Sequence, residues 1–377
     1  MFATRFQRWM YLYVAKPFFF QQDPEKVHDN MTRFGKMLGH YSFTRKATSF
    51  LYQYKHPALE QNILGIHFSN PIGLTAGFDK DAHLTRILPY VGFGFEEIGS
   101  VTGEPCLGNP KPRLWRLPKS KGLVVYYGLK NDGAEAIVAR LKKETFGFPI
   151  GISVAKTNNP STVETDAGIA DYIKAMKTFV EADIGDYFTV NVSCPNAYGG
   201  EPFSTPERLD LLLEALDKVE TKKPIFVKLS ADTDFEKIDK MVEVTDRHRV
   251  HGFVLTNLTK NRQNPLIRPN EIAGIEKGGM SGKPIFDLSN HLISHLYQSK
   301  GDRYVIMGSG GVFSAEDAYE KICLGASLIQ LVTGMIFEGP QLIGEINQGL
   351  VGLLERDGFT SIHEAIGSRY QKKQENI

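Results

Sequence analysis

The segment NVSCPNAYGG, residues 191–200, places a thiol between two amides. Cys194 follows an apolar run and precedes Pro195, which excludes a helix and favours an extended or turning loop. Asn191 and Asn196 offer amide hydrogen bonds to a planar polar ligand, and the sulfur can act as a base or nucleophile. A single cysteine is more often a buried, inert side chain, so the catalytic hypothesis rests on the amides and the loop.

Two lysines stand where they can serve an anionic ligand. Lys228 ends the apolar run PIFV, and Lys80 follows the run 71–76 closely. A lone lysine is usually a solvated surface charge. A lysine that ends a buried strand is different, because its side chain is expected at the edge of the sheet where ligands bind.

Glycine-rich backbone predicts a phosphate site. GSGGV, residues 308–312, precedes a helix that opens at Ser314, and Thr333-Gly334 follows the next apolar run. Backbone N–H groups at such turns and helix starts bind anions. A phosphorylated cofactor or substrate is therefore expected.

The elements that must position these residues alternate regularly. Apolar or β-branched runs predict strands at 71–76, 95–101, 149–155, 187–193, 224–230, 252–258, 304–309 and 327–333. Helical patterns separate them, beginning with 81–91 and 133–144. Eight such units predict an α/β fold of the (β/α)8 TIM-barrel type, whose site lies at the C-terminal ends of its strands. A doubly wound sheet is the alternative, but the G-x-G-x-x-G fingerprint is absent after the first strand.

The N-terminal region is a different kind of sequence. Residues 1–22 carry Arg5, Arg8 and Lys16, no acid and many aromatics at helical spacing. A second helix is predicted from Pro24, with Asp23 as its N-cap. We expect a small two-helix cap, residues 1–50, before a barrel domain, residues 60–377. The aromatic face fits a helix lying in a membrane interface, and it also fits packing on the protein's own body.

Composition limits the partners and the cellular location that the chain can have. The 44 Lys+Arg and 43 Asp+Glu leave a net charge of +1, which provides no overall field for nucleic acid. Three scattered cysteines argue for a reducing compartment and against a disulfide scaffold or a zinc site. No apolar run approaches the length of a membrane span, so a cytoplasmic, peripherally attached protein is predicted.

These residues carry a family resemblance. NPIGLTAGFDKD, EIGSVT, NPKPRLWRL, NVSCPN, VKLSAD, TNLT, GGMSGKPI, GSGGV and LVTGMIFEGP occur in this order from Asn70 to about Pro340. The combination resembles the dihydroorotate dehydrogenase family. KPFFFQQDPEKVH resembles the membrane-associated, quinone-using class of that family, which carries two helices before its barrel.

The resemblance implies an FMN-dependent oxidoreductase that converts dihydroorotate to orotate in pyrimidine biosynthesis and passes electrons to a quinone. Cys194 would be the catalytic base, and Lys228 would stabilise negative charge on the reduced flavin. By motif position, the flavin would contact Ala76, Gly77, Ser100, Asn191, Lys228, Thr256, Gly282, Gly311 and Thr333. Substrate would be bound by Lys80, Asn191, Asn196 and Asn257, and His28 and Arg116 would lie near the quinone.

Several positions depart from the family pattern. Cys194 resembles the soluble classes, whereas the quinone-using class typically has serine there. Val125 and Leu258 replace an amide and a hydroxyl that bind substrate, and Ser153 and Val332 replace an asparagine and a tyrosine. Two alternatives therefore stay open beside dihydroorotate oxidation: a related FMN oxidoreductase acting on another dihydro-heterocycle, and a flavin-binding protein without turnover.

Overall fold

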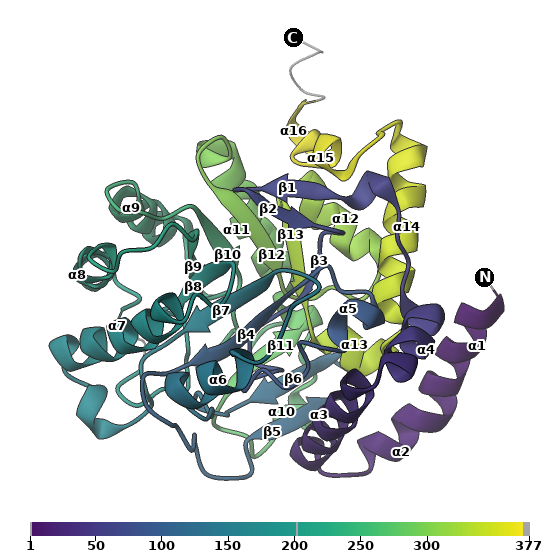
Figure 1. Ribbon diagram of the computed structural model, residues 1–377, viewed down its shortest axis with the longest axis horizontal. Helices are drawn as coiled ribbons and strands as arrows, with labels where there is room; N and C mark the ends of the chain where they lie inside the picture. Colours follow the sequence, from purple (N-terminus) through teal and green to yellow (C-terminus); the bar gives the residue numbers. More distant parts are fainter. Residues whose placement is uncertain (1, 201–202, 372–377) are drawn as a thin grey trace.

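Eight parallel strands close into a barrel in the computed structural model, which describes residues 2–200 and 203–371 (Figure 1). The strands are β3 (Ile72–Leu74), β4 (Phe95–Val101), β7 (Ile150–Val154), β8 (Tyr187–Asn191), β9 (Ile225–Leu229), β10 (Gly252–Leu255), β12 (Val305–Ser309) and β13 (Leu328–Leu331). Each lies within its predicted range, which confirms the TIM barrel. The last residues of the predicted 60–377 domain lie outside the described part.

Aromatic and aliphatic side chains fill one end of the barrel. Phe95, Tyr187 and Phe226 pack there with Phe68, a residue of the hairpin formed by β1 (Gln61–Ile63) and β2 (Ile66–Phe68). The rings of Phe68 and Phe95 meet edge to face at 5.4 Å. This end is a packed plug, so a ligand can enter only from the C-terminal ends of the strands.

Helices surround the barrel as the pattern predicts. They are α5 (Leu88–Val91), α6 (Ala134–Leu141), α7 (Thr165–Glu181), α8 (Pro206–Asp217), α9 (Phe235–Thr245), α11 (Phe286–Lys300), α12 (Ala315–Cys323), α13 (Thr333–Glu338) and α14 (Leu342–Asp357), followed by α15 (Ile362–Ala365) and α16 (Ser368–Gln371). The predicted helix 81–91 is largely wrong, because only its last turn is helical. The buried Asp79 carboxylate instead accepts hydrogen bonds from the backbone N–H groups of His83 and Leu84 and holds a loop.

A small antiparallel sheet lies beside the barrel mouth. It joins β5 (Leu114–Leu117), β6 (Gly122–Val125) and β11 (Gly279–Gly282) in the order β11-β6-β5. A short helix, α10 (Pro269–Ile272), precedes β11. The register pairs Gly279 with Val125, so residues far apart in sequence form one wall of the mouth.

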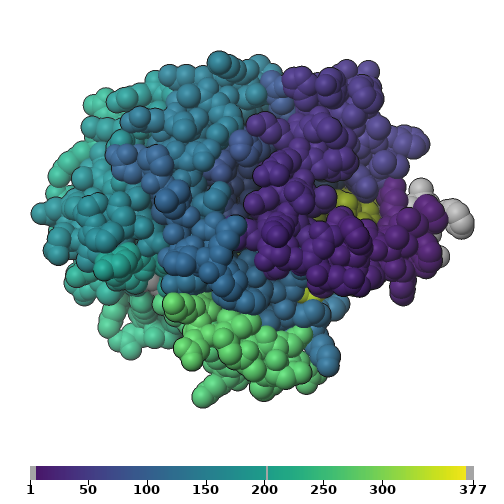
Figure 2. Space-filling model, turned by 90° about the horizontal axis from the view of Figure 1, so that it is seen from below, coloured from purple at the N-terminus to yellow at the C-terminus, as the bar shows by residue number. Residues whose placement is uncertain are grey.

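The N-terminal region contains the two predicted helices and a third. The first runs through α1 (Phe2–Met10), a π-helical turn (Tyr11–Ala15) and α2 (Lys16–Phe20). The second, α3 (Pro24–His40), begins as predicted, with the Asp23 side chain accepting from the Lys26 N–H at 2.8 Å. α4 (Ser42–Tyr52) follows. Figure 2 shows these helices as a purple layer against one side of the barrel.

Polar contacts fasten this layer to the barrel. Arg8 pairs with Glu338 at 2.7 Å and with Glu345 at 2.9 Å. The Tyr11 hydroxyl donates to the Ile336 carbonyl at 2.7 Å. The first helix therefore packs on the protein's own body along one face, and its other face stays exposed.

Candidate active site at the barrel mouth

One cavity opens at the C-terminal ends of the strands, under the small sheet. It brings together nearly all the residues predicted to bind flavin, substrate or quinone. They are His28, Ala76, Gly77, Lys80, Ser100, Asn191, Cys194, Asn196, Lys228, Thr256, Asn257, Gly282, Gly311 and Thr333.

Arg116 is the exception. Its guanidinium donates to the Gln22 carbonyl at 2.8 Å and lies 4.8 Å from the centre of the Phe20 ring. Arg116 therefore ties β5 to the N-terminal helices and does not line the cavity.

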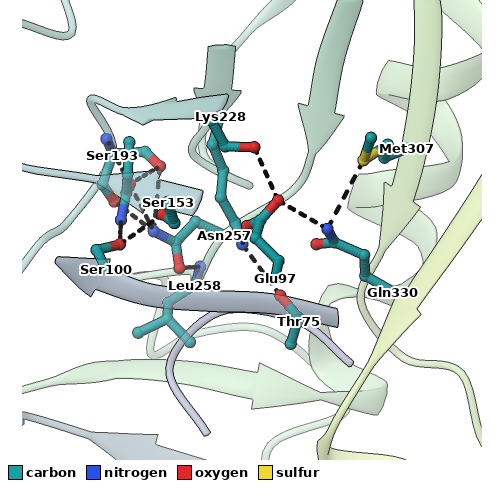
Figure 3. Close-up of polar contacts among 12 residues, drawn as sticks. Thr75, Glu97, Ser100, Ser153, Ser193, Lys228, Asn257, Leu258, Met307 and Gln330 are labelled. Atoms are coloured by element: carbon teal, nitrogen blue, oxygen red, sulfur yellow. Dashed lines mark hydrogen bonds and ion pairs between the residues drawn. The ribbon is translucent and has the colours of Figure 1, made fainter. Parts of the chain in front are cut away.

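A chain of small polar side chains lies at the ends of β4, β7 and β8 (Figure 3). The Asn191 amide donates to the Ser100 hydroxyl at 2.8 Å, and that hydroxyl lies 2.7 Å from the Ser153 hydroxyl. The Asn191 side-chain oxygen accepts from the Ser193 hydroxyl, and the Asn257 side-chain amide donates to the Ser193 backbone carbonyl at 3.0 Å. These bonds fix the amide orientations before a ligand arrives, which suits recognition of a planar polar ring.

Lys228 rises from β9 into the floor of the cavity. Its Nζ donates to the Thr75 hydroxyl at 3.1 Å and lies 3.7 Å from the Glu97 carboxylate (Figure 3). Burial lowers the pKa of Lys228, and Glu97 opposes that shift. The sequence singled out Lys228 but not Glu97, because a carboxylate inside a strand shows no partner until the barrel closes.

Lys80 lies on the wall of the cavity against an aromatic ring. Its Nζ is 4.0 Å from the centre of the Tyr127 ring. Burial, together with the nearby Lys130, lowers the pKa of Lys80 to about 8. Asp81, Asp29 and Asp79 oppose this shift, but no carboxylate of the described residues forms an ion pair with Lys80. An anionic ligand would therefore be its natural counter-ion.

The Cys194 loop lines the cavity and contacts the small sheet. The Asn196 side chain donates to the Val125 carbonyl at 2.9 Å, and the Asn196 carbonyl accepts from Asn109 at 2.9 Å. Lys156 is buried close to Cys194. Burial lowers the pKa of Lys156, and the charge of the Cys194 sulfur acts in the opposite direction. Lys156 follows the predicted strand 149–155, so its position at a strand end already marks it in the sequence as a candidate for the barrel mouth.

The glycine-rich turns form the part of the cavity predicted for phosphate. Gly310 and Gly311 both have positive φ, 117° and 74°, conformations that side chains disfavour. The Ser281 and Thr333 hydroxyls lie 2.9 Å apart beside them. Within the described residues, the buried Thr256 hydroxyl has no hydrogen-bond partner, which leaves a donor available to a ligand.

The side of the cavity that faces the N-terminal helices is mostly apolar. Leu114, Leu123, Val332 and Ile336 line it. His28, from α3, also reaches this side, and its Nε2 lies 2.9 Å from the Phe78 carbonyl. Burial lowers the pKa of His28, so its ring stays neutral near pH 7.

Most departures from the family pattern fall on the cavity wall, and Ser153 is the exception, because it contacts Ser100 without lining the cavity. Val125 and Leu258 both line it. Lys130 lines it too, whereas the next residue, Asn131, is buried and bonded to Thr102 at 2.8 Å. An amide at position 131 therefore does not replace the one absent at position 125.

Comparison with known proteins agrees with this geometry. The family described as dihydroorotate dehydrogenase matches residues 58–354. A Trichodesmium erythraeum protein named dihydroorotate dehydrogenase (quinone) is 36% identical over 360 residues, covering 92% of this chain and 94% of the relative. A Haloarcula marismortui protein of the same name is 37% identical over 357 residues, covering 94% and 98%. The crystal structure of DHODH in complex with ferulenol from Eimeria tenella has a TM-score of 0.81 and 28% identity, covering 92% of this chain and 95% of that one.

Proposed function

The chain belongs to the dihydroorotate dehydrogenase family of oxidoreductases, and we propose that it oxidises dihydroorotate to orotate with FMN and a quinone acceptor. One observation carries the proposal. A thiol-bearing loop, the strand-end lysines and a glycine-rich anion site line a single cavity. This arrangement supplies a proton acceptor, substrate charge recognition and a cofactor site together.

The residues present fit FMN. The unpartnered Thr256 hydroxyl and the positive-φ glycines at 310 and 311 suit a phosphate-bearing cofactor. A Cβ at Gly77 would meet no atom within 4 Å, so the backbone there borders open space where a flat ring can lie. Ala76, Ser100, Asn191, Gly282 and Thr333 would complete the contacts, with Lys228 near the ring edge that becomes negative. When bound, FMN supplies the acceptor for the hydride that leaves C6 of the substrate.

The protein's own residues would orient the substrate and remove its proton. Lys80 would bind the carboxylate, and Asn191, Asn196 and Asn257 would hold the polar ring edges by hydrogen bonds. Cys194 Sγ, as the thiolate, would take the C5 proton. The buried Lys156 ammonium beside it favours the thiolate by charge. The small sheet and the Cys194 loop would cover part of the bound substrate.

The N-terminal helices would receive the quinone. Exposed side chains of α1, the π-helical turn and α2, including Trp9, Tyr13 and Phe18, give these helices an apolar outer face. We place His28 and the apolar cavity wall on the quinone path and assign residues 1–50 to this cap and 60–377 to the barrel. No helix in the described part of the chain is long and apolar enough to cross a membrane. Peripheral attachment at the cytoplasmic face is the arrangement that we propose.

Anaerobic reduction of the purified yellow protein by dihydroorotate tests the reaction. We expect prompt loss of flavin absorbance, slowed about 10²–10⁴-fold in Cys194→Ala because general-base catalysis contributes that much. Cys323→Ala is the matched control, because Cys323 ends α12 outside the cavity. A soluble quinone should restore the colour, and His28→Ala should slow that step alone. Flavin reduction at the wild-type rate in Cys194→Ala would overturn the assignment of the base.

A second candidate follows from the cavity wall. The side chains of Val125 and Leu258 offer no hydrogen bond to a substrate ring, which favours another dihydro-heterocycle with a less polar edge. Bound flavin that ignores dihydroorotate but is bleached by such a compound would select this candidate. A flavin that no dihydro compound reduces would indicate a binding protein without turnover.

A further inference from the structure

Glu97 lies inside the barrel, below the cavity floor. It belongs to β4, and its side chain is 0% exposed. Its Oε1 is 3.7 Å from Lys228 Nζ, whose side chain is 5% exposed. The two opposite charges therefore meet in a volume from which water is excluded.

Neutral side chains from other strands hold this carboxylate in place. Glu97 Oε2 accepts from the Thr189 hydroxyl at 2.8 Å and from the Gln330 amide at 2.9 Å. The same amide lies 3.7 Å from the Met307 sulfur (Figure 3). On the other side of the pair, Thr75 accepts from Lys228 at 3.1 Å. Both partners are thus oriented by residues that cannot move independently of the barrel.

A buried ammonium needs a counter-charge to remain protonated. Desolvation disfavours the charged form of lysine, and a nearby carboxylate restores it. Burial and Glu97 are the influences that act on the Lys228 pKa, in opposite directions. The charge of Lys228 therefore depends on Glu97.

We infer that Glu97 is a positioning residue that keeps Lys228 charged and aimed at the cavity floor, and thereby sets the reduction potential of the flavin. The inference rests on the proposed function, because it places FMN above Lys228. A positive charge beside the ring edge stabilises the anionic reduced flavin and makes reduction by substrate more favourable.

The midpoint potential of the bound flavin in Glu97→Gln tests this role. Glutamine keeps the shape and the partners but removes the charge, so Lys228 loses its proton and the potential falls. We expect the equilibrium constant for two-electron reduction to drop at least tenfold, which corresponds to 29.6 mV. An unchanged potential overturns the inference. A rise overturns it too, because it would show that the ammonium stays charged without the carboxylate.

A double-mutant cycle separates action through Lys228 from a direct effect of the carboxylate. In the Lys228→Met background, Glu97→Gln should change the potential little. An equal shift in both backgrounds would overturn the inference.

Glu96→Gln is the matched control. It replaces the adjacent residue of β4, which is also fully buried but interacts with Asp79. Burial, reinforced by Asp79, raises the pKa of Glu96 well above its usual range. Among the described residues, the ion pair of Lys228 is with Glu97 and not with Glu96, so the potential should stay at the wild-type value. A fall as large as that of Glu97→Gln would overturn the inference.

If Glu97→Gln does not fold, Thr189→Val provides a second test of the role of Glu97. It removes one hydrogen bond to the carboxylate, and we expect a smaller fall in potential. A wild-type potential in a folded, flavin-loaded Thr189→Val overturns the role of this network. If the wild-type protein does not bind flavin, the proposed function itself is rejected. If it binds flavin but the Glu97 variants keep the wild-type potential, only the inference about Glu97 is rejected.

Discussion

The barrel and the N-terminal helices depart from the usual distribution of side chains in opposite ways. The barrel buries charges, including Lys80, Glu97 and Lys228. The N-terminal helices expose apolar side chains. Among the described residues, thirteen large apolar side chains are exposed before residue 52 and six after it. Buried charges and large exposed apolar surfaces are both uncommon in soluble proteins unless they serve a function. Each region is therefore a candidate for binding.

The two regions differ in the kind of partner that would stabilise them. Within the barrel mouth, a buried charge needs a partner, which the protein supplies for Lys228 and which substrate would supply for Lys80. On the helices, the exposed apolar surface needs a nonpolar phase, which a membrane interface would supply. In the function that we propose, the mouth would bind a polar, charged ligand and the helices would bind a lipid surface, with the apolar cavity wall between them.

The buried ion pair between the two regions provides the largest expected effect. Glu25 of α3 pairs with Arg113 at 2.8 Å, and both side chains are nearly inaccessible. Glu25→Ala leaves the guanidinium buried without its partner, which costs about 3–5 kcal/mol. Urea unfolding should show this loss, and hydrogen exchange should accelerate in α3 before the barrel strands. Glu214→Ala, which breaks an exposed pair on α8, should cost at most about 0.5 kcal/mol. Equal losses in the two variants would contradict the distinction between buried and exposed pairs.

Charges placed on the exposed aromatic face should weaken membrane binding. Trp9→Glu combined with Phe18→Glu removes two apolar side chains, each worth about 1.5–3 kcal/mol when fully buried. We expect at least about a tenfold lower affinity for phospholipid vesicles, measured by co-sedimentation, with flavin reduction unchanged. Leu211→Glu is the control, because Leu211 is similarly exposed but lies on α8 of the barrel. A similar loss in the control would show that the helices are not the membrane-binding face.

The pH dependence of substrate affinity gives the smallest expected effect. Burial lowers the pKa of Lys80 to about 8, so its ammonium predominates below that pH and is lost above it. The KM for dihydroorotate should rise above pH 8 and approach about a tenfold increase per pH unit, since that is the fall in the protonated fraction. Lys80→Met should have a high KM that does not rise over this range. A KM that rises equally in both proteins would assign the titration to another group.

Local sequence predicted the repeating elements because their signals are local. Apolar runs and helical spacing indicated all eight barrel strands, and Asp23 marked the start of α3. Polar residues at the predicted strand ends also identified the lining of the cavity. Closure of a parallel barrel brings the C-terminal ends of all its strands together, so residues at those ends become neighbours. The helix predicted at 81–91 failed because Asp79 captures the backbone N–H groups of a loop, a competition that helical spacing does not reveal.

Tertiary structure decided which residues act together. Pairing of β6 with β11, from distant parts of the chain, places Val125 on the cavity wall, and closure of the barrel brings Glu97 to Lys228. Contacts with Gln22 and Phe20 hold Arg116 between β5 and the N-terminal helices, outside the cavity, a position that its motif alone does not reveal. By itself, the sequence determined the barrel, the first two N-terminal helices and most residues that line the cavity, because periodicity and turn chemistry are local properties. The charge partners and the exposed face of the cap depend on packing between distant segments, and only the folded chain decides them.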